Sequence, residues 1–269
     1  RVTETGLVVV CADDPELTRL RGHLTRRVVS YGVADPTADV YGDAVELDPT
    51  GSRCRVRWTR DHRTVSVPLE VGVPGRHNLL NALAAFAVGL EIGLEPDRIA
   101  IALGRFAGVD RRFQRRGVVG GVKVIDDYSH HPTEIAAALS TARQQPHARL
   151  VAVFQPHRYT RTARLLDAFA RVLAVADVVV LTDIFAAGET PIPGITSKRL
   201  ADAVDGYTDG AVHYVRTLDE TVSLVADLAR AGDLVLTLGA GSIGQVAGRL
   251  VDALERRIGL PGPSEKGPS

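Results

Sequence analysis

Two patterns of apolar and polar positions divide the chain. From residue 113 to 258, short apolar runs alternate with longer stretches whose apolar residues recur at helical spacing. The runs predict strands at 122–125, 150–154, 178–181, 212–215 and 234–238. The stretches between them predict helices at about 133–145, 160–175, 197–204, 218–230 and 243–257. This alternation is typical of a Rossmann-like α/β fold, in which a mostly parallel sheet carries helices on both faces.

Residues 1–112 show a mixed pattern. Valine-rich runs predict strands at 6–11 and 28–31, with a capped helix at 15–23 between them. Alternating apolar and polar residues over 38–69 predict a hairpin with its turn at Asp48-Pro49-Thr50-Gly51. Two further helices are predicted, at 78–92 and 96–105. We place a domain boundary after Arg112, and we predict that residues 259–269, rich in proline, glycine and serine, are disordered.

Composition narrows the classes of function. Basic and acidic residues number 32 each, so the chain lacks the positive excess of a general nucleic-acid binder. No apolar stretch approaches the roughly 20 residues that span a bilayer, so no membrane role is predicted. Two cysteines, Cys11 and Cys54, are too few for a disulfide framework and favour a cytoplasmic setting. Because the chain starts at Arg1 and contains no methionine, we expect it to be part of a longer protein, cut before residue 1.

Polar clusters follow the predicted strands, where ligands bind in an open α/β sheet. The first cluster is Asp126-Asp127-Tyr128-Ser129-His130-His131, directly before Pro132 and a helix. Free N–H groups at such a helix start favour an anion. Either carboxylate alone could equally be a loop or cap residue. No third ligand accompanies the two histidines at suitable spacing, so we predict no metal site.

A second cluster contains Arg158 and Arg161, which lie three residues apart at a helix start. This spacing points both guanidinium groups the same way, in a geometry that binds carboxylate or phosphate. Because the helix dipole disfavours cations there, the pair predicts a compensating anion. A surface salt bridge is the alternative. Asp183 and Glu189 flank a small-residue loop after the next strand, and they give a weaker signal.

Gly239, Gly241 and Gly244 match the pattern G-x-G-x-x-G after the last strand. A dinucleotide fingerprint opens a βαβ unit with an acidic residue about 20 residues later, whereas here only one helix and the tail follow. A non-catalytic nucleotide- or dinucleotide-binding module therefore remains an alternative. Earlier in the chain, Asn78 and Asn81 share one face of a predicted helix, and Asn78 is also its predicted N-cap. An asparagine amide has the donor and acceptor that an adenine edge needs.

Together these motifs resemble the Mur ligase family. The resemblance runs through HNLLNALAA, GVDRRFQ, DDYSHHPTEI, FQPHRYTRT, DIFAAGE and GAGSI, and DDYSHHP with QPHRYTRT is the specific pair. It implies that residues 1–112 are the later part of a P-loop-type ATPase domain and that 113–258 are a C-terminal amino-acid-binding domain. The implied activity is ATP-dependent amide formation between L-alanine and UDP-N-acetylmuramate through an acyl phosphate, in peptidoglycan precursor synthesis.

The resemblance also implies roles for individual residues. Adenine would be held by His77, Asn78 and Asn81, ATP phosphate by Arg112 and ribose by Asp127. Tyr128, His130 and His131 would line the catalytic cleft, and Arg158 with Arg161 would bind the alanine carboxylate or the product. The chain has no G-x-x-x-x-G-K-[ST] phosphate loop. We therefore expect this loop and the Mg²⁺ ligands before residue 1, and no ligase activity from the chain alone. A ligase that recycles murein peptides is the sister alternative.

Overall fold

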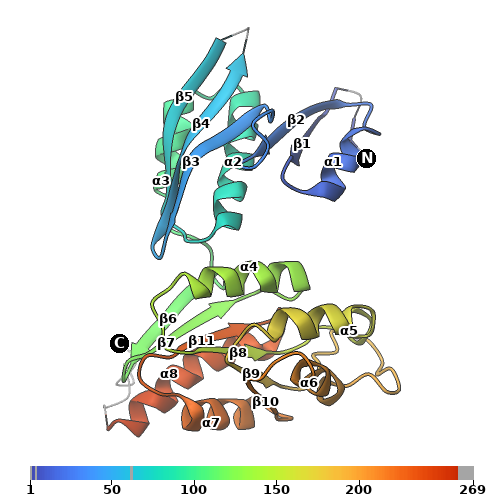
Figure 1. Ribbon diagram of the computed structural model, residues 1–269, viewed down its shortest axis with the longest axis vertical. Coiled ribbons are helices and arrows are strands. Elements are labelled where there is room, and N and C mark those ends of the chain that lie inside the picture. Colours follow the sequence, from blue (N-terminus) through green and yellow to red (C-terminus); the bar gives the residue numbers. More distant parts are fainter. Residues whose placement is uncertain (1, 4, 61–62, 260–269) are drawn as a thin grey trace, which may run out of the picture. The chain divides into compact units, whose positions relative to one another are not determined.

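The computed structural model describes residues 2–3, 5–60 and 63–259 (Figure 1). The chain forms two compact units, Arg1–Gly108 and Val109–Ser269. The sequence placed the boundary after Arg112 instead. Arg111 lies in the second unit because its side chain bonds to Asp126 and its carbonyl accepts from the backbone N–H of Tyr128. Residues 260–269, nearly all of the tail predicted to be disordered, lie outside the described residues.

The first unit begins with a parallel pair of strands. α1 (Pro15–Arg21) connects β1 (Leu7–Cys11) to β2 (Arg27–Gly32). The carboxylate of Asp14 caps this helix by accepting from two backbone N–H groups, each at 2.9 Å. Three further strands complete the sheet in the order β1-β2-β3-β4-β5: β3 (Val40–Asp48), β4 (Gly51–Arg60) and β5 (Arg63–Val71). Both β3 with β4 and β4 with β5 are antiparallel, so the predicted hairpin is two consecutive hairpins.

α2 (Arg76–Glu91) packs across this sheet, and α3 (Pro96–Gly104) packs beside β5. Leu79, Leu83 and Phe86 of α2 are fully buried among apolar strand residues. The prediction that Asn78 caps α2 is wrong. Gly75 is the N-cap, and Asn78 lies in the first turn, where its side-chain amide donates to the carbonyl of Pro74 at 2.7 Å.

The second unit contains a six-stranded sheet in the order β10-β9-β8-β11-β7-β6. Its strands are β6 (Gln114–Val119), β7 (Val122–Asp127), β8 (Leu150–Phe154), β9 (Val178–Leu181), β10 (Ala211–Tyr214) and β11 (Leu234–Leu238). Every neighbouring pair is parallel except β6 with β7. The predicted α/β fold with a mostly parallel sheet is confirmed, although the sequence did not predict β6.

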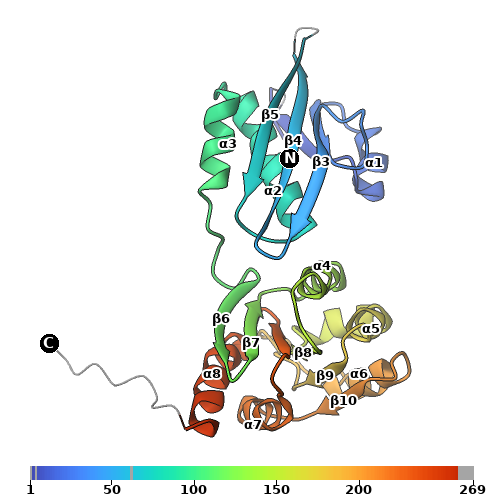
Figure 2. The ribbon, with the colours of Figure 1, turned by 60° about the vertical axis from the view of Figure 1, so that its left-hand side comes forward.

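Helices cover both faces of this sheet (Figure 2). One face carries α4 (Pro132–Arg143), α5 (Tyr159–Leu173) and α6 (Ser197–Asp205), and the other carries α7 (Leu218–Leu228) and α8 (Val246–Arg257), which follows the 3₁₀ turn Ser242–Gln245. A hydrophobic core lies on each face of the sheet, and successive side chains of β8 point alternately into the two cores. Phe154 faces α5, whereas Val153 faces the side of α7 and α8. In the described part of the chain, no helix is long and apolar enough to cross a membrane.

The topology marks one edge of this sheet as a ligand site. The chain leaves β7 and β8 toward α4 and α5 on one face, but it leaves β11, which lies between them, toward α8 on the other. In open α/β sheets, ligands bind at the carboxyl ends of strands where the connections reverse in this way.

Candidate active site

Four aromatic rings form a continuous row beyond the carboxyl ends of β7, β8 and β9. The rings of Tyr128 and His130 meet edge to face with centroids 5.4 Å apart. His130 then contacts His157 at 5.8 Å, and His157 stacks on Phe185 at 5.5 Å. The loops that carry the last two rings are joined by backbone hydrogen bonds of 2.8 Å, from Arg158 to Phe185 and from Phe185 to Pro156. The structure thus brings the predicted Tyr128 and His130 together with two residues that the sequence analysis did not select.

The surroundings of His157 favour the neutral form of its imidazole. Burial, followed by the charge of Arg161, lowers the pKa of its imidazole below the ordinary 6.5. Nη1 of Arg161 lies 3.4 Å from Nδ1 of His157. Because a guanidinium only donates, Nδ1 must accept, and the neutral ring then carries its hydrogen on Nε2. His157 therefore offers an N–H donor to a ligand rather than a proton acceptor.

A cationic pocket lies beside this row. It has a volume of about 390 Å³ and is lined by His131, Arg158, Thr160, Arg161, Arg164 and Leu165. Arg164 is a third arginine at the same helical spacing, and the sequence analysis did not select it. The spacing itself was the available signal, because residues 158, 161 and 164 continue one face. Three guanidinium groups around so small a volume suit a compact anion such as a carboxylate.

The N-terminus of α5 already has a protein anion. The carboxylate of Glu189 accepts from the backbone N–H of Thr160 at 3.0 Å and from its hydroxyl at 2.6 Å. These bonds, together with the charge of Arg158, lower the pKa of Glu189. Glu189 thus supplies part of the negative charge that the arginines predicted. Arg158 itself has φ +74°, in the left-handed region that residues other than glycine rarely adopt, and this conformation is stored strain at the pocket mouth.

The N-terminus of α4 is also satisfied from within. His131 caps the helix, accepting from the backbone N–H of Thr133 at 3.4 Å. The carboxylate of Glu134 reaches back to the N–H groups of His130 and His131, at 3.0 and 3.2 Å. Burial works to raise the pKa of Glu134, but these N–H groups and nearby positive charges outweigh it and the pKa is lowered. The anion predicted for this helix start is therefore Glu134.

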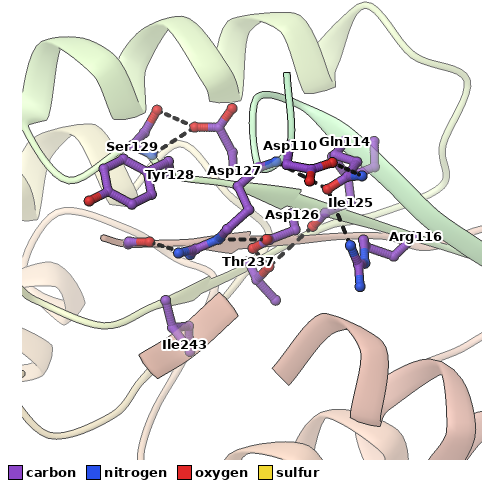
Figure 3. A network of polar contacts seen from close by, with 12 residues as sticks. Asp110, Gln114, Arg116, Ile125, Asp126, Asp127, Tyr128, Ser129, Thr237 and Ile243 are labelled. Atoms are coloured by element: carbon purple, nitrogen blue, oxygen red, sulfur yellow. Dashed lines mark hydrogen bonds and ion pairs between the residues drawn. The ribbon is translucent and has the colours of Figure 1, made fainter. Parts of the chain in front are cut away.

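Asp126 and Asp127 are the last two residues of β7, not the first loop residues, and both are buried. Figure 3 shows their carboxylates bonded to different partners. Asp126 accepts from Arg111 at 2.9 Å and from the hydroxyl of Thr237 at 2.6 Å. Asp127 accepts from the backbone N–H of Phe113 at 2.7 Å and from both the backbone and hydroxyl of Ser129. Each oxygen of Asp127 thus has a protein partner, and its contact with ribose remains a prediction.

The glycine loop after β11 is filled by protein atoms. A Cβ at Gly241 would lie 2.6 Å from Cγ of Phe185, and one at Gly244 would lie 2.5 Å from the guanidinium carbon of Arg111. Gly239 has φ +141° and its carbonyl accepts from Arg111 at 2.6 Å. In a dinucleotide fingerprint, the glycines make room for the pyrophosphate. Here they make room for Phe185 and Arg111, which argues against the dinucleotide-binding alternative.

The predicted adenine residues lie in the first unit, on the first turns of α2. Asn78 uses one amide hydrogen on Pro74, and Asn81 is exposed. His77 is half-buried. Arg112, the predicted phosphate ligand in the second unit, is exposed, with its guanidinium 5.6 Å from the centre of the Tyr128 ring. Among the described residues, no group of three or more histidine, cysteine, aspartate or glutamate side chains has the geometry to hold a metal ion.

The fold and the pocket define a doubly wound α/β protein with a cationic pocket at the carboxyl ends of its parallel strands. Comparison with known proteins gives the family. A model described as "Mur ligase middle domain" matches residues 1–89, and one described as "Mur ligase, glutamate ligase domain" matches residues 111–241. The chain belongs to the Mur ligase family, and the resemblance drawn from its motifs is confirmed.

Individual relatives sharpen this result. The UDP-N-acetylmuramate–L-alanine ligase of Solibacter usitatus (strain Ellin6076) is 45% identical over 93% of this chain and 52% of that protein. The crystal structure of the UDP-N-acetylmuramate–alanine ligase MurC from Thermotoga maritima matches at 28% identity and a TM-score of 0.71, over 93% of this chain and 52% of that one. The MurF ligase of Thermotoga maritima in complex with ADP shares the fold at 20% identity and a TM-score of 0.70, over 95% and 55%. The chain thus spans about half the length of these relatives.

Proposed function

We propose that the chain forms part of an ATP-dependent ligase that joins L-alanine to UDP-N-acetylmuramate during peptidoglycan precursor synthesis in the cytoplasm. The observation that carries this proposal is the arginine-lined pocket at the reversal point of the second sheet, whose volume of about 390 Å³ suits a small amino acid. The chain's similarity to the UDP-N-acetylmuramate–L-alanine ligase of Solibacter usitatus and to the UDP-N-acetylmuramate–alanine ligase of Thermotoga maritima supports the same substrates.

In this proposal, the pocket binds L-alanine through its carboxylate. The forks of Arg158 and Arg161 would make charge-assisted hydrogen bonds to the two oxygens. Neutral His157 would add a donor without adding a positive charge that repels the alanine ammonium. The amine is then left free to attack.

The reaction itself has two steps. The UDP-N-acetylmuramate carboxylate attacks the terminal phosphorus of ATP, which yields an acyl phosphate and ADP. The alanine amine then attacks the acyl carbon, loses a proton and expels phosphate. Both steps build negative charge on oxygen, which fixed positive groups stabilise. We assign Tyr128, His130, His131 and Arg112 to this charged cleft.

We further propose that His77, Asn78 and Asn81 bind adenine and that Asp127 binds ribose. Support for Asn78 comes from its amide, which keeps its oxygen and one hydrogen for a ligand after bonding to Pro74. Mg²⁺ would supply positive charge that offsets the charge of the ATP phosphates, but the described residues contain no cluster that fits it, so we assign it no ligand here.

Kinetics of the complete enzyme test the amino-acid site. Arg158→Ala or Arg161→Ala removes a charge-assisted bond worth about 1.5–3 kcal/mol. The KM for L-alanine in an assay of alanine-dependent ATP hydrolysis should therefore rise roughly 10- to 150-fold. Arg171→Ala is the matched control, because Arg171 lies on the same helix but pairs with Asp167 away from the pocket. An unchanged KM in both pocket variants would remove them from the site.

The same assay separates the alternatives. The recycling ligase predicts turnover with a murein peptide in place of L-alanine, whereas a non-catalytic module predicts no ATP hydrolysis with either. Calorimetric titration of the chain with NAD tests the dinucleotide alternative directly. The 269-residue chain alone is expected to show no alanine-dependent ATP hydrolysis. Measurable turnover would contradict our expectation that the reaction needs a phosphate loop, a motif that this sequence does not contain.

A further inference from the structure

Arg111 makes four hydrogen bonds near the site, and the motifs leave its role unassigned. Its Nε donates to the buried carboxylate of Asp126 at 2.9 Å, and its Nη2 donates to the carbonyl of Gly239 at 2.6 Å. Its own backbone N–H donates to Gln114 at 3.0 Å, and its carbonyl accepts from the N–H of Tyr128 at 2.6 Å. Arg111 therefore links the start of the second unit, the end of β7 and the glycine loop after β11.

Two features of this arrangement cost free energy, the left-handed backbone of Arg111 and the buried charge of Asp126. We therefore take it as a specific feature of the fold. Arg111 has φ +59°, in the left-handed region that disfavours residues with a Cβ. The side chain of Asp126 is 1% exposed, and a buried carboxylate is tolerated only when its charge and lone pairs are satisfied. Arg111 and Thr237 provide that satisfaction.

The glycine loop is shaped around this guanidinium. Gly244 leaves no room for a Cβ, because that atom would lie 2.5 Å from the guanidinium carbon and 2.7 Å from Nε of Arg111. Gly244 does not have a positive φ, so its backbone would accept alanine. A glycine is therefore needed at this position only because the guanidinium of Arg111 occupies the space that a Cβ would need.

Arg111 also reaches the aromatic row. Its guanidinium carbon lies 5.1 Å from the centre of the Tyr128 ring, within the range of a cation–π contact. The ring of Tyr128 in turn meets that of His130. Arg111 thus holds Tyr128 at two points, its backbone N–H and its ring, and through Tyr128 it holds the row that borders the cationic pocket.

We propose that Arg111, seated on Gly244 and paired with Asp126, is a positioning residue that fixes Tyr128 and His130 for binding of the amino-acid substrate. This inference rests on the proposed ligase function. It predicts that displacing Arg111 weakens substrate binding even when Arg111 itself, and every residue assigned to the substrate, is retained.

Two single variants and their combination test it in the complete enzyme. Gly244→Ala keeps every polar group but displaces the guanidinium of Arg111 from its position against Gly244. Arg111→Lys keeps the charge but cannot donate in two directions. Each should raise the KM for L-alanine roughly 10-fold, a loss of about 1.4 kcal/mol in binding free energy, because the aromatic row beside the pocket is displaced. The kcat should fall as well, because Tyr128 and His130 also line the proposed catalytic cleft. The double variant should be no worse than the worse single one, because both remove the same interaction.

The control is Arg115→Lys on β6, an exposed arginine nearby, and its kinetics and thermal midpoint should match those of the wild type. Rescue gives a second readout, since Arg111→Lys should retain more alanine affinity than Arg111→Ala. If Gly244→Ala and Arg111→Lys leave the KM at the wild-type value, or if their effects multiply, the positioning role is wrong. Loss of thermal stability with a proportional loss of kcat and an unchanged KM would overturn it as well. A wild-type enzyme without alanine-dependent turnover would instead refute the proposed function, and this inference with it.

Discussion

Gly241→Ala tests whether protein side chains fill the space beside the glycine loop after β11. Gly241 has φ −95°, so the substitution avoids the penalty of the left-handed region and acts mainly through the space that the new Cβ needs. The new Cβ would lie 2.6 Å from Cγ of Phe185 and 2.8 Å from Oε1 of Gln155. Gln155 is buried, and the same oxygen accepts from the backbone N–H of Ile243 at 3.0 Å.

The structure sets the size of the effect. Overpacking of a well-filled site costs about 1–3 kcal/mol. A weakened hydrogen bond to Gln155 adds about 0.5–1.5 kcal/mol. We therefore expect Gly241→Ala to lower the free energy of unfolding of the second unit by about 2–4 kcal/mol. For a unit of this size, each kcal/mol shifts the thermal midpoint by about 2–4 °C, so the midpoint should fall by roughly 4–16 °C.

Calorimetry and far-UV circular dichroism of the chain measure this loss. Fluorescence of Trp58, the only tryptophan, reports the first unit and shows whether the effect is confined to the second. Displacement of Phe185 also uncovers His157. Because burial is the largest cause of the lowered pKa of His157, its pKa should move back toward 6.5, which titration of the ring protons by NMR detects.

A second substitution isolates the mechanism. Phe185→Ala removes the ring that clashes with the new methyl group, so it should recover at least about 1 kcal/mol in the Gly241→Ala background. If the free energy of unfolding of Gly241→Ala lies within about 0.5 kcal/mol of the wild-type value, the loop has free space and is not closely packed against Phe185 and Gln155. Equal losses with and without Phe185 would place the clash elsewhere.

Two further predictions concern the scaffold. Gly89→Ala in α2 puts a Cβ 2.8 Å from Cδ1 of Ile99, so an overpacking cost of about 1–3 kcal/mol exceeds the helix-propensity gain of about 1 kcal/mol and should destabilise the first unit by up to about 2 kcal/mol. In Gly248→Ala in α8, the new Cβ meets nothing nearer than 3.7 Å, so only the propensity gain remains and the second unit should be stabilised by about 0.5–1 kcal/mol. Urea unfolding compares the two variants. Glu134→Gln keeps the capping geometry without the charge, and should cost about 0.3–1 kcal/mol at pH 7. Because the pKa of Glu134 is lowered on folding, its contribution is present above the unfolded value near 4.5 and is lost as pH falls through the folded value, so variant and wild type should converge below pH 4.5; a constant difference down to pH 3 would contradict this.

The sequence predicted most of the second unit because its central strands are buried on both faces and read as unbroken apolar runs. β8, with all five residues buried, is the clearest case. The sequence did not predict β6, because its first residues, Gln-Arg-Arg, are polar and typical of an exposed segment. This strand is fixed by backbone pairing with β7 rather than by side-chain burial. The third strand of the antiparallel segment was merged into one predicted hairpin, because the sequence between β4 and β5 has no glycine or proline to mark a second turn.

The candidate site was predicted in outline and missed in its details. Tyr128, His130, Arg158 and Arg161 lie at the predicted sheet edge because the carboxyl ends of parallel strands must meet there. Phe185 comes from a loop after β9, and no local pattern tells that its ring stacks on His157. The reason for Gly244 was also invisible, because the atom that needs its space belongs to Arg111, far away in the chain.

One consequence of the structure bears on how a substrate anion can bind. The sequence predicted anions at the start of both α4 and α5, where helix N–H groups are unpaired. Part of each helix start already has a protein anion: Glu134 accepts from the N–H groups of His130 and His131 just before α4, and Glu189 accepts from the N–H of Thr160 on α5. The larger concentration of positive charge is on the pocket wall, where Arg158, Arg161 and Arg164 lie together and Glu189 balances only part of it. Recognition of a carboxylate here must therefore depend on guanidinium groups, which is why single arginine substitutions, rather than changes at the helix caps, should carry the loss of affinity.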